Sequence, residues 1–274
     1  MLCGGLETLR GALRGMERAA VAVSGGADSA FLLHVAREEL GTERVTALTA
    51  RSRLMAEEEM ASAEAVCRAE GVRQVVVDFE PLDVEGFAEN PPERCYLCKR
   101  ALFGALLERC AEEGLGTLAE GTNADDAGEY RPGLRALREL GVRSPLLEAG
   151  LKKADVRALS REMGLKTWDK PSLACLATRF PHGDRITAEG LSRVESAERL
   201  LRGAMPGLRQ ARVRVHGDMA RIEVGPETMA EVLARRGEVS EGLKGLGFAY
   251  VALDLEGFRS GSMNPAGTGK GGTA

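Results

Sequence analysis

The chain has 274 residues, 44% of them hydrophobic and 28% charged, and carries a formal net charge of −4. This length allows one large domain or two ordinary ones, each with a core of its own. No apolar run approaches the roughly 20 residues of a membrane helix, so we expect no membrane partner. The negative net charge argues against a nucleic-acid-binding surface over the whole chain, although it is compatible with a local basic groove.

The N-terminal segment and the cysteines indicate the cellular compartment. The start, MLCGGLETLRGALRGM, lacks the apolar core and the small-residue cleavage site of a signal peptide. We therefore expect a cytoplasmic protein. In that compartment the six cysteines are reduced thiols or metal ligands, not a disulfide framework.

The first half of the chain alternates helical and strand patterns. An amphipathic helix is expected over residues 5–18, followed by a buried strand over 19–23 that stops at glycines. Further helices are expected over 30–40, 56–70 and about 97–113, and further strands over 45–48, 72–79 and in TLAEGTNADD. This order predicts a Rossmann-like α/β domain, with a parallel sheet covered on both faces.

The second half has a different character, which predicts a smaller α+β domain. A connection without clean periodicity leads to a helix over 186–201, and QARVRVHG and MARIEVG then alternate as a hairpin. The remaining patterns are helices over 226–236 and 239–246 and a last strand, FAYVALDL. We expect domains over 1–168 and 169–263, the second serving the substrate or oligomer assembly, and a disordered tail over 264–274.

The segment SGGADS, residues 24–29, lies between the first strand and the next helix. Its glycines allow the backbone to approach a ligand, and its amides and the helix N-terminus favour an anion. The segment lacks the Lys-Ser/Thr end of a Walker loop and the G-x-G-x-x-G of dinucleotide sites. The plainer alternative is a glycine turn with Asp28 as helix cap.

S-G-G-x-D-S after an N-terminal strand resembles the loop of the ATP pyrophosphatase superfamily, the PP-loop enzymes. That family binds the pyrophosphate part of ATP and transfers AMP to an oxygen of its substrate. The resemblance implies that the loop binds ATP through Ser24, Gly25, Gly26, Asp28 and Ser29.

A second polar loop, EGTNADD over residues 120–126, follows a predicted parallel strand. Such loops lie at the carboxyl edge of the sheet, where nucleotides bind in these folds. We expect Gly121, Asn123 and Asp126 to contact ATP, and Asp125 and Asp126 to hold Mg²⁺ together with Asp28. An Asn/Asp-rich turn without a ligand is the alternative.

Cys95 and Cys98 form a C-x-x-C motif, whose spacing allows two thiolates to bind one metal. Zinc, redox and cluster sites share this motif, and no second C-x-x-C completes a zinc site. With Cys175 the set contains three thiolates, and a [4Fe–4S] cluster held by three cysteines leaves one iron open to a ligand such as sulfide. Cys3, Cys67 and Cys110 are interpreted as structural or incidental.

Several longer motifs make a resemblance to one family specific. NPPERCYLCK, GTNADDAGEYRPGLRALRELGVRSPLL, WDKPSLACLATRFPHGDRIT and VRVHGDMARIEV resemble the LarE sulfur transferases of nickel-pincer nucleotide cofactor synthesis. The resemblance covers nearly the whole chain. It implies a homo-oligomer, such as the hexamers of this family. It also implies an enzyme that adenylates a carboxylate of pyridinium-3,5-biscarboxylic acid mononucleotide, releases pyrophosphate and forms a thiocarboxylate.

The family has two forms, which differ in their sulfur donor. In one form the cysteine that matches Cys175 gives up its own sulfur and becomes dehydroalanine. In the other, three cysteines bind a [4Fe–4S] cluster whose open iron carries a sulfide. The presence of Cys95 and Cys98 beside Cys175 fits the cluster form, with ATP and Mg²⁺ as the other cofactors.

The resemblance also implies roles for single residues. Asp28 and Cys175 are the expected catalytic residues, and Lys99 is expected to meet ATP, a free surface lysine being the alternative. Glu223 and either Glu195 or Glu198 are candidates for metal binding or proton transfer. Two guanidinium groups on one face of a strand can hold the substrate phosphate, and the residues expected to do so are Arg212 and Arg214, joined by Arg179.

Three other interpretations stay open from the sequence. The two arginines of the predicted hairpin are also compatible with a solvated strand face. A tRNA-thiolating PP-loop enzyme shares SGGxDS with C-x-x-C, although the acidic balance and the C-terminal half argue against it. A non-catalytic nucleotide-sensing module would bind ATP without releasing pyrophosphate.

Overall fold

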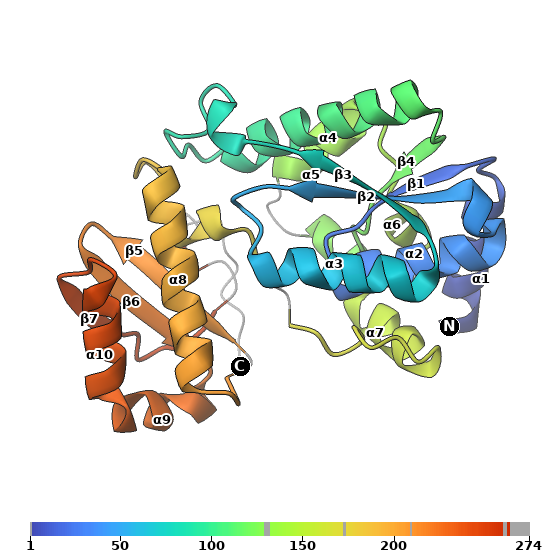
Figure 1. Ribbon diagram of the computed structural model, residues 1–274. Coiled ribbons are helices and arrows are strands. Elements are labelled where there is room, and N and C mark those ends of the chain that lie inside the picture. Colours follow the sequence, from blue (N-terminus) through green and yellow to red (C-terminus); the bar gives the residue numbers. More distant parts are fainter. Residues whose placement is uncertain (1, 129–131, 172–173, 209, 260–261, 264–274) are drawn as a thin grey trace. The chain divides into compact units, whose positions relative to one another are not determined.

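The computed structural model of the chain describes residues 2–128, 132–171, 174–208, 210–259 and 262–263 (Figure 1). The chain divides into two compact units, one of Met1–Val84 with Cys95–Leu173, the other of Glu85–Arg94 with the chain from Ala174 onward. The tail over 264–274, expected to be disordered, lies outside the described residues.

This division differs from the expected single boundary after residue 168. The chain leaves the first unit for the last time after residue 173, not after residue 168. Residues 85–94 belong to the second unit, although their sequence position places them in the first domain. Hydrogen bonds across about 90 residues of chain explain the difference: Asn90 Nδ2 donates to the Pro181 carbonyl at 2.6 Å, and the Ile186 amide donates to Ala88 at 2.8 Å. Such long-range bonds leave no local pattern in the sequence.

A parallel sheet with the strand order β3-β2-β1-β4 forms the centre of the first unit. Its strands are β1 (Ala19–Ala22), β2 (Val45–Arg51), β3 (Arg73–Asp78) and β4 (Thr117–Ala119). Its helices are α1 (Leu2–Arg14), α2 (Ala27–Leu40), α3 (Glu57–Glu70), α4 (Arg94–Glu113), α5 (Pro132–Glu139), α6 (Pro145–Glu148) and α7 (Lys153–Glu162). The predicted Rossmann-like α/β fold is confirmed.

Helices cover both faces of this sheet. Successive residues of a strand point to opposite faces, so neighbours enter different cores. Val21 packs into a core with α1, α2, α3 and α7, whereas its neighbour Ala20 packs into a second core with α4 and α5. Figure 1 shows α4 and α3 on opposite sides of the strands. The carboxyl ends of the strands thus remain the edge from which loops can form a site.

The second unit is the expected small α+β domain. Strands β5 (Ala211–His216) and β6 (Met219–Val224) form the predicted antiparallel hairpin, and β7 (Tyr250–Leu253) pairs with β6 in parallel. Helix α8 (Ala188–Ala204) packs on β5 and on α10 (Arg236–Gly245), which also contacts β7. The short helix α9 (Met229–Ala234) completes the connection to α10.

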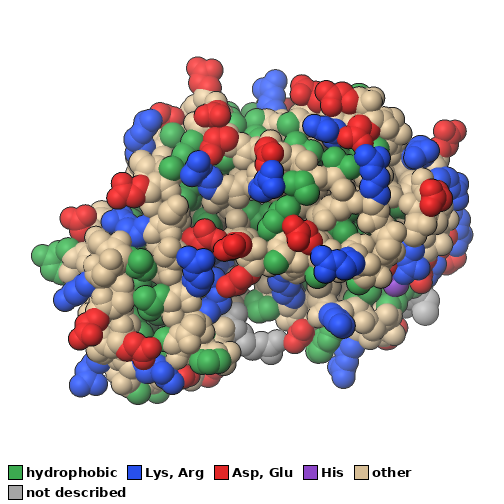
Figure 2. Space-filling model, viewed as in Figure 1, with side chains coloured by type: hydrophobic (Ala, Val, Ile, Leu, Met, Phe, Trp, Pro, Cys, Tyr) green, Lys and Arg blue, Asp and Glu red, His purple; other side chains and the backbone are tan. Residues whose placement is uncertain are grey.

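Figure 2 shows acidic and basic side chains interspersed over the face in view. Among the described residues, no helix is both long and apolar enough to cross a membrane.

Candidate functional site

The SGGADS loop connects β1 to α2, as the sequence predicts. Gly25 has a φ of +75°, and a Cβ at this position would lie 2.6 Å from the Glu59 carbonyl oxygen and 2.8 Å from the Ala63 nitrogen. Only glycine combines this backbone conformation with so close an approach to α3. Helix α2 begins immediately after Gly26, so its first amides face the loop.

Side-chain hydroxyls hold the loop in shape. The Ser24 amide donates to Ser29 Oγ at 3.2 Å, and Ser29 Oγ donates to the Gly26 carbonyl at 3.2 Å. The alternative in which Asp28 caps the helix is wrong, because Gly26 is the N-cap residue and Asp28 lies inside the first turn. Asp28 is therefore available for another partner.

That partner is Lys153, the first residue of α7. Its Nζ lies 2.5 Å from Asp28 Oδ2. The other carboxylate oxygen, Oδ1, is buried and has no hydrogen-bond partner among the described residues. A buried carboxylate oxygen without a donor fits a bound cation, since oxygen is the ligand that Mg²⁺ prefers. This oxygen of Asp28 therefore fits a bound Mg²⁺.

The second loop, over residues 120–126, lies against the first. A Cβ on Gly121 would lie 3.0 Å from the Ser29 nitrogen, closer than most Cβ contacts in proteins, so glycine suits this close approach of the two loops. The Asp125 amide donates to Asn123 Oδ1 at 3.0 Å, and the Asn123 amide donates to Asp126 Oδ2 at 3.1 Å. The side chains of Asn123 and Asp126 thus stabilise the turn of this loop, which lies beside the phosphate loop.

The fold brings two lysines to the phosphate loop that the sequence motifs do not predict there. Lys153 reaches Asp28, and Lys170 Nζ donates to the Gly25 carbonyl at 2.8 Å. Burial lowers the pKa of Lys170. Their chain distances from the loop, 125 and 145 residues, hide both contacts from motif analysis. Lys99, expected at ATP, lies over the Phe103 ring, 5.8 Å from its centroid, and beside Gly133.

Cys95 and Cys98 both lie in the first turns of α4, which begins at Arg94, two residues after the proline pair Pro91–Pro92. A spacing of three residues places two side chains on the same face of a helix, so both thiols can reach one metal. Cys95 is exposed and Cys98 is half-buried. The pair fits two of the three ligands of a cluster.

Cys175 is exposed and directly precedes a short 3-10 turn, Leu176–Arg179. It belongs to the second unit, whereas Cys95 and Cys98 belong to the first. Within the described ranges, no group of three or more His, Cys, Asp or Glu side chains forms a metal site. Burial raises the pKa of Cys67 and of Cys110 to about 11, which fits their interpretation as structural thiols.

The three arginines expected to bind phosphate are buried together in the second unit. Arg179 pairs with Glu198, with an Nε to Oε1 distance of 2.6 Å, and Arg214 pairs with Glu223 at 2.7 Å. Arg212 is 2% exposed and lies over the Phe258 ring, 5.2 Å from its centroid. The solvated strand face considered as an alternative is therefore wrong.

The charges in this cluster favour an anion. Three guanidinium groups share the interior with two buried carboxylates, those of Glu198 and Glu223. Glu223 also accepts from Arg221 at 3.0 Å and from Ser262 Oγ at 2.9 Å. Burial, and then repulsion from Arg179, lowers the pKa of Arg212 to about 10. Of the two helix glutamates considered, Glu198 is the one that the fold buries.

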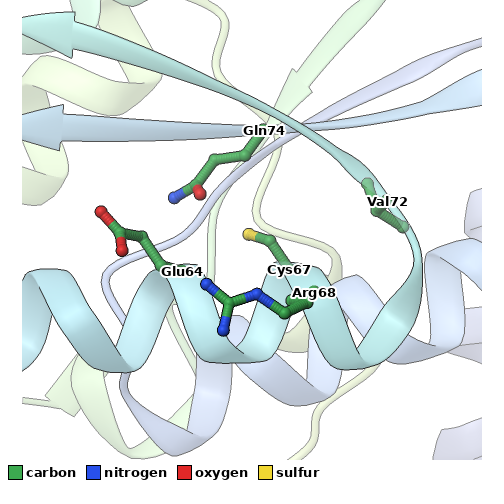
Figure 3. Close-up of a pocket in the computed structure, with 5 residues that line it drawn as sticks. All are labelled: Glu64, Cys67, Arg68, Val72 and Gln74. Carbon is green, nitrogen blue, oxygen red and sulfur yellow. The ribbon is translucent and has the colours of Figure 1, made fainter.

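The first unit also contains a hollow. Glu64, Cys67 and Arg68 rise into it from α3, and Gln74 enters it from β3 (Figure 3). Val72 completes the lining. None of the residues expected to bind ATP, sulfur or substrate lines this hollow.

Comparisons with known proteins identify relatives along nearly the whole chain. A pyridinium-3,5-bisthiocarboxylic acid mononucleotide synthase of Lactiplantibacillus plantarum is 38% identical over 257 residues, 94% of this chain and 92% of that protein. An uncharacterized protein of Synechocystis sp. is 40% identical over 266 residues, 96% of this chain and 98% of that protein.

A family model for NAD synthase matches residues 9–94, which include the SGGADS loop. This match supports the PP-loop assignment of the first unit, and the full-length relatives extend it to the second. Together with the geometry of the phosphate loop, they confirm the family that the motifs predict. The chain belongs to the LarE family of PP-loop enzymes, the family of the pyridinium-3,5-bisthiocarboxylic acid mononucleotide synthase.

Proposed function

We propose that this ATP-dependent sulfurtransferase converts a carboxylate of pyridinium-3,5-biscarboxylic acid mononucleotide to a thiocarboxylate during nickel-pincer cofactor synthesis. The observation that carries the proposal is the relative of that name, 38% identical over 94% of this chain. The SGGADS loop, with a glycine at φ +75° packed closely against α3 and an unpartnered Asp28 oxygen, supports the ATP-dependent step.

The reaction has two steps. A carboxylate oxygen of the substrate attacks the α-phosphorus of ATP, and pyrophosphate leaves with the electron pair of the broken P–O bond. A sulfur nucleophile then attacks the acyl carbon, and AMP leaves. Adenylation is required because the delocalised charge of a free carboxylate resists nucleophiles.

In this proposal the phosphate loop and the loop over residues 120–126 bind the nucleotide. The loop amides and the α2 N-terminus hold the phosphates that leave as pyrophosphate. Asp28 binds the Mg²⁺ that accompanies them. The proposed ATP ligands are Ser24, Gly25, Gly26, Asp28, Ser29, Lys99, Gly121, Asn123 and Asp126.

The substrate phosphate is assigned to the buried arginine cluster of the second unit, Arg179, Arg212 and Arg214. Guanidinium groups bind phosphate through paired hydrogen bonds, and the excess of positive charge over Glu198 and Glu223 favours a dianion. Glu223 is also retained as a candidate metal ligand. The assembly proposed for the family, a homo-oligomer such as a hexamer, is carried over to this chain.

Sulfur delivery is assigned to Cys95, Cys98 and Cys175. A [4Fe–4S] cluster held by these three thiolates supplies a sulfide on its open iron when it is bound. The alternative donor is the thiolate of Cys175 itself, which would leave dehydroalanine in the chain.

The test uses anaerobically purified protein with the pyridinium mononucleotide, ATP, Mg²⁺ and added sulfide, which replaces the sulfide used in each turnover, and follows iron, acid-labile sulfide, pyrophosphate and product mass. We expect iron and repeated turnover in the wild type. The double variant Cys95→Ser with Cys98→Ser should lose iron and thiocarboxylate formation, while pyrophosphate release continues. Cys110→Ala, a matched change on the same helix, should keep both.

Other outcomes separate the alternatives. An iron-free protein that loses the mass of one H₂S after a single turnover would identify Cys175 as the donor. Pyrophosphate release with tRNA and not with the mononucleotide would identify a tRNA-thiolating enzyme. ATP binding without any pyrophosphate release would identify a nucleotide-sensing module and contradict the proposed activity.

A further inference from the structure

Lys153 connects the two loops of the candidate ATP site. Its side-chain Nζ lies 2.5 Å from Asp28 Oδ2 in the first loop. Its backbone amide donates to Asp125 Oδ2, in the second loop, at 2.9 Å. One residue thus contacts two of the three carboxylates that we expect at the metal.

The backbone of Lys153 is fixed independently of these contacts. It is the first residue of α7, and the preceding amide, that of Lys152, donates to Asp155 Oδ2 at 2.9 Å. The Leu151 carbonyl accepts from the Ala124 amide at 2.8 Å, which joins the start of α7 to the second loop. The flexible part is the side chain, whose four-carbon stem allows the ammonium group to move while the backbone stays.

The Asp28 carboxylate is used on one side only. Oδ2 faces the Lys153 ammonium group, whereas Oδ1 is buried without a described partner. A divalent cation that bound Asp28 would bring two further positive charges close to that ammonium group. At such distances repulsion between like charges is strong in a partly desolvated site.

We propose that Lys153 is a placeholder cation, which balances Asp28 while the nucleotide site is empty. When Mg²⁺ enters with ATP and binds Asp28, the ammonium group leaves this carboxylate and donates to an oxygen of the pyrophosphate portion of ATP. Free divalent cations are then kept out of the empty site, because they would have to displace Lys153 with no phosphate to receive it. The inference rests on the proposed ATP chemistry and adds a positioning residue to it.

The test measures two affinities that need no sulfur transfer. Mn²⁺ binding without nucleotide is followed by electron paramagnetic resonance, and Mg²⁺–ATP binding by calorimetry. Lys153→Met should bind free Mn²⁺ about tenfold more tightly and Mg²⁺–ATP about tenfold more weakly than wild type, the size of one charge-assisted hydrogen bond. Lys153→Arg keeps the positive charge, so it should exclude free Mn²⁺ as wild type does.

Lys152→Met is the matched control, because it removes a neighbouring exposed ammonium group and keeps the backbone; both affinities should stay at the wild-type values. Unchanged or weaker Mn²⁺ binding in Lys153→Met would overturn the placeholder role, even if ATP binding fell. If Lys153→Met fails to fold, Lys153→Gln takes its place. Both affinities can behave as expected while no thiocarboxylate forms, in which case the proposed function fails and this inference stands.

Discussion

Arg212 is a charged side chain in the interior of the second unit, 2% exposed. Burial and Arg179 lower its pKa to about 10, so at neutral pH the folded protein carries a positive charge that has lost most of its hydration. This folded pKa lies below the ordinary value of 12.5, so the destabilisation is fully present at neutral pH and shrinks only as the pH rises above about 10. A bound anion would offset this destabilisation by pairing with the Arg212 charge.

We predict that Arg212→Met separates stability from binding. The variant should weaken binding of the pyridinium mononucleotide at least about tenfold, because one charge-assisted contact is lost. Its free energy of unfolding in urea should equal or exceed that of wild type, since a desolvated charge is removed. Arg236→Met, at an exposed position, should change neither quantity. Unchanged affinity with lower stability would assign Arg212 to the core alone.

Gly25 is a second single residue on which the candidate ATP site depends, through its backbone conformation and its close contact with α3. We predict that Gly25→Ala lowers the free energy of unfolding by about 1–3 kcal/mol and abolishes ATP binding, since the added Cβ must displace the α3 backbone. Gly41 is the matched control, with a φ of +79° and no atom within 4 Å of an added Cβ. Gly41→Ala should show the strain and keep ATP affinity; equal loss of affinity in both variants would contradict the argument.

At the scale of elements, the sequence patterns predicted most helices and strands to within a few residues. Periodicity finds β1, β2 and β3 because each is short, apolar and bounded by turn residues. The start of α4 was expected near residue 97, whereas the helix begins at Arg94. The proline pair Pro91–Pro92 lies just before this start, and proline is common near helix N-termini because its fixed φ suits the first turn.

The sequence predicts residues 85–94 in the first domain, because nothing in their composition marks them as part of the second unit. Its anchor is Asn90, which is 0% exposed and has a φ of 55°, a conformation that Asn tolerates better than most residues. Its side chain accepts from Arg94 and donates to the Pro181 carbonyl.

We predict that Asn90→Ala destabilises the second unit by about 2–4 kcal/mol, the sum of lost hydrogen bonds and backbone strain. Asn90→Gly should recover about 1 kcal/mol of this loss, because glycine removes the strain and not the missing bonds. Amide hydrogen exchange in β5 and β6 measures the effect locally. Protection equal to wild type in both variants would show that the segment does not hold the second unit.

At the scale of the whole molecule, the SGGADS loop, its neighbouring loop and the cysteine motif were found from local spacing. Local spacing also places two arginines on one strand face. Local spacing does not predict that this face is buried, nor that Lys153 and Lys170 reach the phosphate loop. Those features depend on contacts between distant parts of the chain. The family assignment followed from motifs spread along the chain and is confirmed by the full-length relatives.

The path of the chain between the units has a consequence for taking the protein apart. The chain passes from one unit to the other three times, after Val84, after Arg94 and after Leu173. A protease cut at any one passage leaves the units covalently joined, and a fragment that ends at residue 168 lacks nearly all of the second unit but retains its anchor segment. Cys95 is the first residue after one passage and Cys175 the second after another, so two of the three cysteines proposed to deliver sulfur lie directly beside the connections between the units.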